Sequence, residues 1–432
     1  MKFRYFLFAL VLTAAVFASG CRGETRINVA TFTPAVPSPT VLQAEPTPQL
    51  SPTAPPATAT PISEPVGVTI TRIKMVDGPS GWAVGEVAGN PNDLILRTSD
   101  GGTTWKQVIP DSAFESAPPG GVSATVYFQD NLYAWVVYAP RSLDPGEQPT
   151  ATIWRSSDGG ASWTTSSLPI QGLTLDYFLP AQIGFNGRQN GWILAHLGAG
   201  MGHDYVTLLL TRDSGASWEV AVSGTSDTLP MSGSKSGAAF LNSKNGWISG
   251  SYDGLQTGLY FWRTHDGGIT WQRQIIPAPE NISADLFINE ENICGADAPQ
   301  FSGDSSGTMV VTCSSYKLDQ PLSWVYVTFD AGQTWNPRSL PGTSGTVDFL
   351  TPYQGWFLGL TDPAKSTSYQ IFATQDSGLT WQQVAPVTWT GELQFLTAQV
   401  GWGVVELNDA RALVKTTNGG YSWSVLKTTL LP

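Results

Sequence analysis

The side chains that could carry out acid–base or metal chemistry are few in this 432-residue chain. Only three histidines occur, and two of them, His196 and His203, lie beside Asp204 in one Gly-rich stretch that we expect to be a loop. Imidazole and carboxylate groups can bind a metal ion, but ligands from a single loop lack the neighbouring groups that orient them. We therefore predict no metal site and no cofactor.

The most regular acidic residues belong to a motif, Ser/Thr-x-Asp-x-Gly-x-Ser/Thr-Trp, that occurs seven times. Its Gly supplies the positive φ of a tight hairpin, and its Asp accepts hydrogen bonds from turn amides. The seventh copy has Asn418, which keeps an acceptor oxygen and loses the charge. We therefore predict that these residues stabilise the hairpin turns through hydrogen bonds and have no catalytic or metal-binding role. They are Asp100, Asp158, Asp213, Asp266, Asp330, Asp376 and Asn418.

A second landmark repeats in step with this motif. An aromatic residue or Met stands seven residues before a Gly-Trp or its substitute, and the motif tryptophans lie about 53 residues apart on average. The pairs are Met75/Trp82, Phe128/Trp135, Phe185/Trp192, Phe240/Trp247, Phe301/Thr308, Phe349/Trp356 and Phe395/Trp402. A period of this length accommodates four short strands and their turns. In the first repeat we expect strands at 69–76, 81–87, 93–98 and 104–109.

These repeats predict an all-β protein, a seven-bladed β-propeller of four-stranded antiparallel blades over residues 67–432. The composition agrees, because 11% of residues are aromatic, only 13% are charged and 45 are glycine. The seventh repeat is complete by Leu426, so the pattern does not indicate ring closure by an exchanged strand. The fifth repeat carries an insertion at about 277–296. Cys294 in this insertion could form a disulfide with Cys313, the alternative being two unpaired buried thiols.

The N-terminal residues have the features of an export signal. Lys2 and Arg4 precede an apolar run that is too short to span a bilayer, and small residues follow it before Cys21. We expect a signal peptide at 1–20 and a lipid-attachment cysteine at Cys21, with ordinary signal-peptidase cleavage as the alternative. Residues 21–66 form a Pro/Thr-rich linker that cannot bury a core. The predicted location is the outer face of a bacterial membrane, periplasmic or at the cell surface.

The net charge of −12 argues against nucleic-acid binding, which requires clustered basic residues. Four basic residues share one position, three residues before the motif Asp or Asn, and could form a partner-facing belt or serve the fold. They are Arg97, Arg155, Arg263 and Lys415.

The motif is the Asp-box, or BNR repeat, of sialidases, xyloglucan-degrading hydrolases and sortilin-type receptors. Combined with the Gly-Trp landmark and the sevenfold count, the chain most resembles the photosystem II assembly and stability factor family of cyanobacteria and plastids. The resemblance covers residues 67–428. It implies an exported lipoprotein whose propeller acts as a protein-binding scaffold, anchored to the membrane through its lipid, for a membrane complex or cell-surface protein.

The enzymatic alternatives have weaker support in the sequence. The sialidase Arg-Ile-Pro motif is absent, and xyloglucan hydrolases place two carboxylates across a cleft between two propellers, of which only one is present. The best carboxylates within the ring are Glu86 and Glu406. We therefore predict that the protein is not an enzyme. The alternative is a cell-surface propeller that binds glycans or resembles glycoside hydrolases.

Overall fold

The computed structural model describes residues 66–431, except 142–150, 174–175, 225–227, 253–257, 281, 284, 290, 316–319 and 362–368. The described residues belong to one unit, Pro61–Pro432. They form β-strands and one short 3-10 helix, η1 (Asp111–Phe114). None of the helical structure in this part of the chain is long and apolar enough to cross a membrane. The predicted signal peptide, Cys21 and nearly all of the predicted linker lie outside the described residues.

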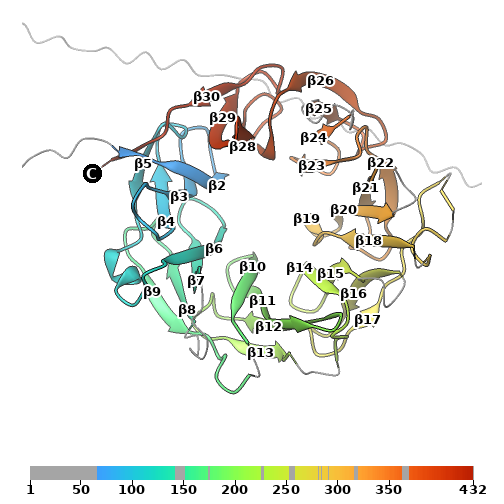
Figure 1. Cartoon of the computed structure of the whole chain (residues 1–432), viewed down its shortest axis with the longest axis horizontal. Coiled ribbons are helices and arrows are strands. Elements are labelled where there is room, and N and C mark those ends of the chain that lie inside the picture. The colour runs from blue at the N-terminus through green and yellow to red at the C-terminus, as the bar shows by residue number, and fades with distance from the viewer. Residues whose placement is uncertain are drawn as a thin grey trace, which may run out of the picture. The chain divides into compact units, whose positions relative to one another are not determined.

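Consecutive strands pair antiparallel in sets of four, and the sets follow one another around a ring (Figure 1). We number the sets in chain order. Set 1 comprises β2 (Thr69–Met75), β3 (Gly81–Glu86), β4 (Leu94–Thr98) and β5 (Thr104–Gln107). Set 2 comprises β6 (Val122–Phe128), β7 (Ala134–Pro140), β8 (Thr152–Ser156) and β9 (Thr164–Ser167). Set 3 comprises β10 (Leu179–Asn186), β11 (Asn190–Gly200), β12 (His203–Thr211) and β13 (Glu219–Val222).

The second half of the described chain continues the same pattern. Set 4 comprises β14 (Ser234–Phe240), β15 (Gly246–Ser251), β16 (Leu259–Thr264) and β17 (Gln272–Arg273). Set 5 comprises β19 (Gln300–Ser302), β20 (Ser306–Ser315), β21 (Leu322–Thr328) and β22 (Asn336–Ser339). Set 6 comprises β23 (Ser344–Phe349), β24 (Gly355–Leu360), β25 (Tyr369–Thr374) and β26 (Gln382–Val387). Set 7 comprises β27 (Thr390–Phe395), β28 (Gly401–Leu407), β29 (Ala410–Thr416) and β30 (Ser424–Leu426). This arrangement is a β-propeller, and the strands of set 1 lie within two residues of their predicted bounds.

The insertion of set 5 contributes a further strand, β18 (Asn292–Ala296). It pairs with β20 and, through Ser251, with β15, so that sets 4 and 5 form one continuous sheet. Cys294 and Cys313 are directly opposed in the β18–β20 ladder and form a disulfide. Both cysteines are buried in a hydrophobic cluster between these two sets.

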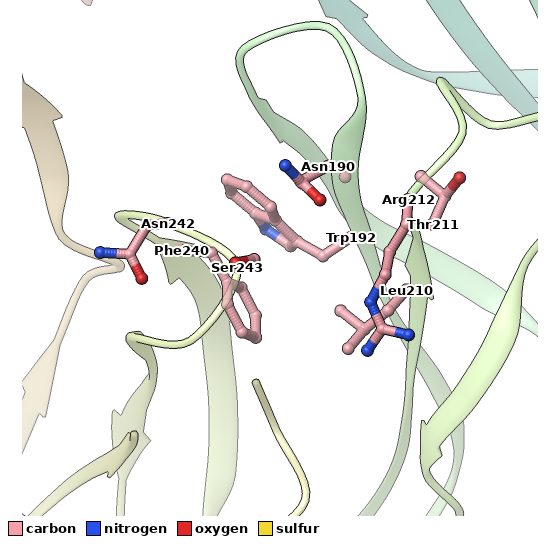
Figure 2. Close-up of a pocket in the computed structure, with 9 residues that line it drawn as sticks. Asn190, Trp192, Leu210, Thr211, Arg212, Phe240, Asn242 and Ser243 are labelled. Carbon is pink, nitrogen blue, oxygen red and sulfur yellow. The ribbon is translucent and has the colours of Figure 1, made fainter. Parts of the chain in front are cut away.

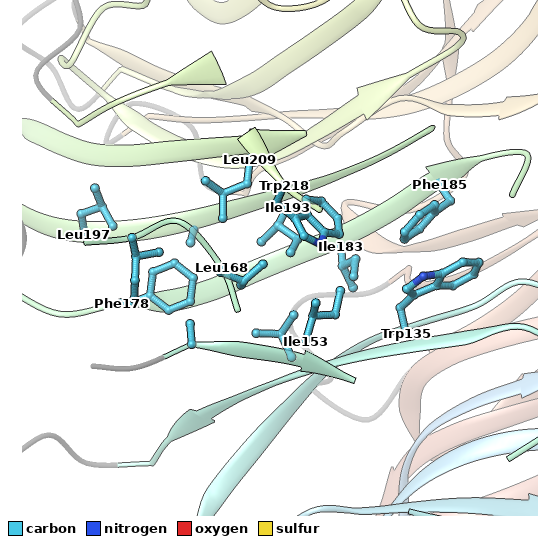
Figure 3. Packing of buried hydrophobic residues seen from close by; sticks show 14 residues of the cluster. Trp135, Ile153, Leu168, Phe178, Ile183, Phe185, Ile193, Leu197, Leu209 and Trp218 are labelled. Carbon is cyan, nitrogen blue, oxygen red and sulfur yellow. The ribbon is translucent and has the colours of Figure 1, made fainter. Parts of the chain in front are cut away.

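The two sequence landmarks meet at the contacts between neighbouring sets. The tryptophan near the start of the second strand of one set packs on the aromatic residue at the end of the first strand of the next set. Ring centroids are 5.3 Å apart for Trp82–Phe128 and 3.6 Å apart for Trp356–Phe395. The motif tryptophan meets the same aromatic ring edge-on, as Trp218 does Phe185. Figure 3 shows this packing between sets 2 and 3, where burial of apolar surface stabilises the contact between sheets.

The ends of the described chain meet in set 1. β31 (Thr429–Leu431) pairs parallel with β5 and antiparallel with β1 (Val66–Gly67). The seam also contains a hydrogen bond from Trp402 Nε1 to the Gly101 carbonyl, at 2.9 Å. The sequence pattern did not indicate an exchanged strand, and sets 1 and 7 each have four strands of their own, but the additional strand β31 outside β5 was not predicted. Three residues are too few to show a hydrophobic period, and their partners lie more than 300 residues away in sequence.

Candidate functional site

A central cavity of about 390 Å³ lies among first strands from four sets, of which β2, β19 and β23 are labelled toward the middle of the ring in Figure 1. Its charged lining residues are Lys74, Asp297, Asp348 and Glu392. They come from sets 1, 5, 6 and 7, so only ring formation brings them to one cavity. The volume of this cavity lies within the range of ligand sites, and its lining is more polar than that of a typical drug-sized pocket.

The central cavity has space partly because one set lacks the tryptophan that the other sets have in their second strand. Thr308 lies near the start of the second strand of set 5, at the position where the other six sets have tryptophan, and it lines the central cavity. Thr308 pairs with Gln300 as Trp356 pairs with Asp348, so it occupies the same register. A smaller side chain at this position leaves Phe349 of set 6 without a tryptophan partner from set 5. Phe349 is accordingly only half-buried, whereas Phe395 is buried.

Asp348 is the acidic residue whose chemistry the fold changes most clearly. It is the penultimate residue of β23, and its Oδ2 accepts a hydrogen bond from the Phe395 amide at 2.7 Å. Burial raises the pKa of Asp348 to about 6, although the Phe395 amide and the Lys74 charge oppose this rise. A carboxyl group with such a pKa is substantially protonated in mildly acidic solution, which suits a general acid.

The other acidic residues of the cavity are more open. Asp297 follows β18 and is accessible from the cavity, and the surrounding protein raises its pKa by desolvation. Glu392 in β27 is exposed into the same space. Glycoside hydrolysis uses one protonated carboxyl group and a second carboxylate, and the lining of this cavity contains candidates for both. Sequence reasoning missed these residues. The signal that could have found Asp348 is its register, one residue before Phe349, where other repeats have neutral residues or Lys74.

Two exposed aromatic side chains, which do not line the central cavity, lie on turns of sets 5 and 6. Tyr353 lies in the turn after β23, and Phe329 lies in the Asp-box turn of set 5. Their exposed fractions are 59% and 43%, and their rings stack at 5.9 Å with an interplanar angle of 22°. The Ser377 amide donates to the Tyr353 carbonyl at 2.9 Å, which fixes the turn. Exposed, nearly parallel rings of this kind offer an apolar surface to a ligand.

A second depression, between sets 3 and 4, is much smaller (Figure 2). Trp192 and Phe240 form its apolar part, and Asn190, Arg212 and Asn242 surround them. Its volume of about 20 Å³ is enough for roughly one water molecule. The central cavity is therefore the better candidate for a ligand site.

The Asp-box residues bond within their own hairpins. Asp213 accepts hydrogen bonds from the Thr211 hydroxyl at 2.8 Å and from the Ser217 amide at 2.8 Å. Asn418 does the same from Thr416 and Ser422, at 2.9 and 3.0 Å. Hydrogen bonds from Ser217 and its neighbours lower the pKa of Asp213 to about 2. None of these residues lines the central cavity.

Three of the four basic residues at the shared position are held by neighbouring groups. Arg97, Arg263 and Lys415 lie over the rings of Trp82, Trp247 and Trp402, at 4.4, 4.9 and 4.7 Å. Arg155 is placed differently and lines another cavity. None of the four enters the central cavity, and their proposed role in partner binding stays a prediction.

The remaining sequence candidates are not brought together. Glu86 lies 3.4 Å from Arg141 and is not part of the central cavity, and neither is Glu406. His196 and Asp204 are on paired strands, where a loop was expected, and His196 Nδ1 lies 2.8 Å from Asp204 Oδ1. His203 instead stacks on Tyr205. Among the described residues, no group of three or more His, Cys, Asp or Glu side chains is placed to hold a metal ion.

No protein-family model matches the chain. Over 306 residues it is 28% identical to a xyloglucanase from Paenibacillus sp, a match that covers 62% of this chain and 28% of that relative. The chain therefore spans well under half of the relative's length. A puromycin-hydrolysing peptidase from Mycobacterium tuberculosis has a similar structure, with a TM-score of 0.51, 9% identity and coverage of 84% of this chain and 53% of the peptidase. YCF48 from Cyanidioschyzon merolae gives a TM-score of 0.41 and 16% identity, covering 84% of this chain and 98% of YCF48.

The similarity to a xyloglucanase contradicts the prediction that the protein is not an enzyme. That prediction assumed that catalytic carboxylates must face each other across two propellers, and it considered only Glu86 and Glu406 within the ring. It overlooked the acidic residues of the first strands, which are far apart in sequence and meet only in the central cavity. The structural likeness to the peptidase concerns the fold alone.

Proposed function

We propose that this chain is a seven-bladed propeller of glycoside-hydrolase type that acts on a polysaccharide. The observation that carries this proposal is the raised pKa of Asp348, about 6, in a cavity that Asp348 shares with two further acidic residues. The 28% identity to a xyloglucanase points to the same class of substrate.

In this proposal Asp348 protonates the glycosidic oxygen. Its Oδ2 is held by the Phe395 amide, which leaves Oδ1 to carry the proton. Asp297 or Glu392 acts as the second carboxylate, either as a base toward water or as a nucleophile. Phe329 and Tyr353 would bind a neighbouring sugar ring outside the cavity.

The N-terminal features fit a substrate outside the cell. A signal peptide at 1–20, a lipid on Cys21 and the Pro/Thr-rich linker would place the propeller at the outer face of a bacterial membrane, where large polysaccharides are accessible. The resemblance to photosystem II assembly factors supports a competing hypothesis, in which the propeller binds a membrane protein complex.

The test measures the release of reducing ends from xyloglucan and from other β-glucans by the purified full chain. We expect Asp348→Asn to lower the rate at least 100-fold, because an amide cannot donate the proton. The variant should fold, since Gln394 already bonds the Met75 amide through an amide oxygen at the equivalent position of set 7.

Asp376→Asn is the matched control, because it changes an Asp-box carboxylate that is remote from the cavity lining and Asn418 shows that an amide fits there. Its rate should stay within about twofold of the wild type. Absence of turnover on every polysaccharide, with co-purification of a membrane complex, would favour the assembly hypothesis. Equal rates for Asp348→Asn and Asp376→Asn would remove Asp348 from the mechanism.

A further inference from the structure

Arg155 differs from the basic residues that share its register. The Arg97 Nη2 group donates to Asn131 Oδ1 at 3.3 Å, and Arg263 Nη1 donates to the Gly332 carbonyl at 3.1 Å. Both guanidinium groups therefore bond to a turn of the next set. The Arg155 side chain, by contrast, forms no hydrogen bond to the next set among the described residues, and its Nε is buried without a partner, as Arg97 Nη1 and Arg263 Nε also are.

The Arg155 side chain instead lines a cavity of about 250 Å³ between sets 2 and 3. The other lining residues are Tyr133, Trp135, Ser156, Ser157, Thr164 and Ser214. The lining thus combines one guanidinium group with aromatic rings and several hydroxyl groups. It contains no acidic residue.

The acidic side chains nearest in sequence to this cavity already have partners. The Asp158 carboxylate accepts hydrogen bonds from Ser156 and Ser162, within its own hairpin. Asp130 pairs with Arg188 at 3.3 Å, and the Arg188 guanidinium lies 4.2 Å from the centre of the Tyr133 ring. Arg155 therefore keeps its charge available although the protein as a whole is acidic.

We propose that this cavity, named here the Arg155 site, binds an oxyanion, either a carboxylate or a sulfate group carried by an acidic sugar. A guanidinium group binds such groups through two parallel hydrogen bonds, and the Arg155 guanidinium group lines the cavity without a hydrogen bond to the described protein. The hydroxyl-rich lining and the Tyr133 ring suit the remainder of a sugar. The site is separate from the central cavity, so the inference does not depend on the proposed function.

The experiment titrates the full chain with sodium sulfate and, separately, with sodium glucuronate, at constant ionic strength balanced with chloride. Binding is measured by calorimetry for the wild type, Arg155→Met, Arg155→Lys and the matched control Arg97→Met. We expect saturable binding of at least one probe to the wild type and to Arg97→Met, and at least tenfold weaker binding to Arg155→Met. Arg155→Lys should be intermediate, because lysine keeps the charge and lacks the planar fork.

Glucuronate binding that is tighter than sulfate binding would assign the site to an acidic sugar, and the reverse order would assign it to sulfate. Saturable binding to neither probe would overturn the inference, and so would equal affinity in Arg155→Met and Arg97→Met. Circular dichroism verifies the fold of each variant. If Arg155→Met does not fold, undiminished binding by Arg155→Lys counts against the site and weakened binding supports it.

Discussion

At the scale of single residues, one register position serves two purposes in neighbouring sets. Gln394 and Asp348 both bond the amide of the aromatic or Met residue that ends the next set's first strand. Gln394 does this without charge. Asp348 does it with a carboxyl group, whose desolvation raises its pKa. The structural contact alone does not require an acid here, which is why the charge points to chemistry.

The raised pKa of Asp348 has a consequence for stability. The folded state binds the proton of the Asp348 carboxyl group more tightly than the unfolded chain does. Proton binding therefore contributes its full stabilisation of the folded state below about pH 4, and this contribution is lost as the pH rises through about 6. Above that pH the buried charge costs up to about 3 kcal/mol. Asp348→Asn should therefore become more stable than the wild type between pH 4 and 7, measured by urea unfolding at several pH values.

For Asp376 we expect the opposite dependence of stability on pH, which Asp376→Asn tests in the same urea unfolding experiment. Hydrogen bonds from Thr380 and Thr374 outweigh desolvation and lower the pKa of Asp376, so its stabilisation is present at neutral pH and lost as the pH falls. A wild-type stability that changes with pH in parallel with Asp348→Asn would contradict the raised pKa of Asp348.

At the scale of elements, the Asp-box hairpins and the inserted strand β18 are held by different means. Each hairpin satisfies turn amides through its own side chains, as Asp213 does, although neighbouring sets also bond the turn carbonyls. β18 instead depends on partners in two sets, β15 and β20, and on a disulfide to β20. A strand without a local hairpin of its own gains more from a covalent link.

Removal of this disulfide should lower the stability of the propeller. The cysteines are separated by 19 residues, and a loop of that size corresponds to about 3 kcal/mol in the chain-entropy model. The double variant Cys294→Ala/Cys313→Ala should unfold at correspondingly lower denaturant concentration, and reductant should no longer affect it. A wild type whose unfolding midpoint is unchanged by reductant would speak against a stabilising disulfide.

At the scale of the whole molecule, the ring is closed by contacts between its first and last sets. β31 adds to β5, Trp402 bonds Gly101, and Gln394 bonds the Met75 backbone. The central cavity draws residues from sets on both sides of this seam. Closure therefore positions the candidate site as well as stabilising the fold.

Deletion of residues 429–432 should destabilise the ring by about 2–4 kcal/mol, since it removes several backbone hydrogen bonds and the partly buried Leu430. Thermal unfolding would measure the loss. Leu431→Ala is the control, because Leu431 is 41% exposed and keeps the strand. An unchanged melting temperature after the deletion would mean that the side-chain contacts close the ring alone.

The sequence by itself determined the strands of the first repeat, the repeat period and the change at Thr308. These features are encoded locally, in turn chemistry and in a repeat of about 53 residues. Only the tertiary structure decided that Lys74, Asp297, Asp348 and Glu392 share a cavity, that β31 closes the ring and that Arg155 lacks the partners of Arg97 and Arg263. Each of these depends on contacts between distant sets. Such contacts carry no periodic signal, because they arise only when the ring forms.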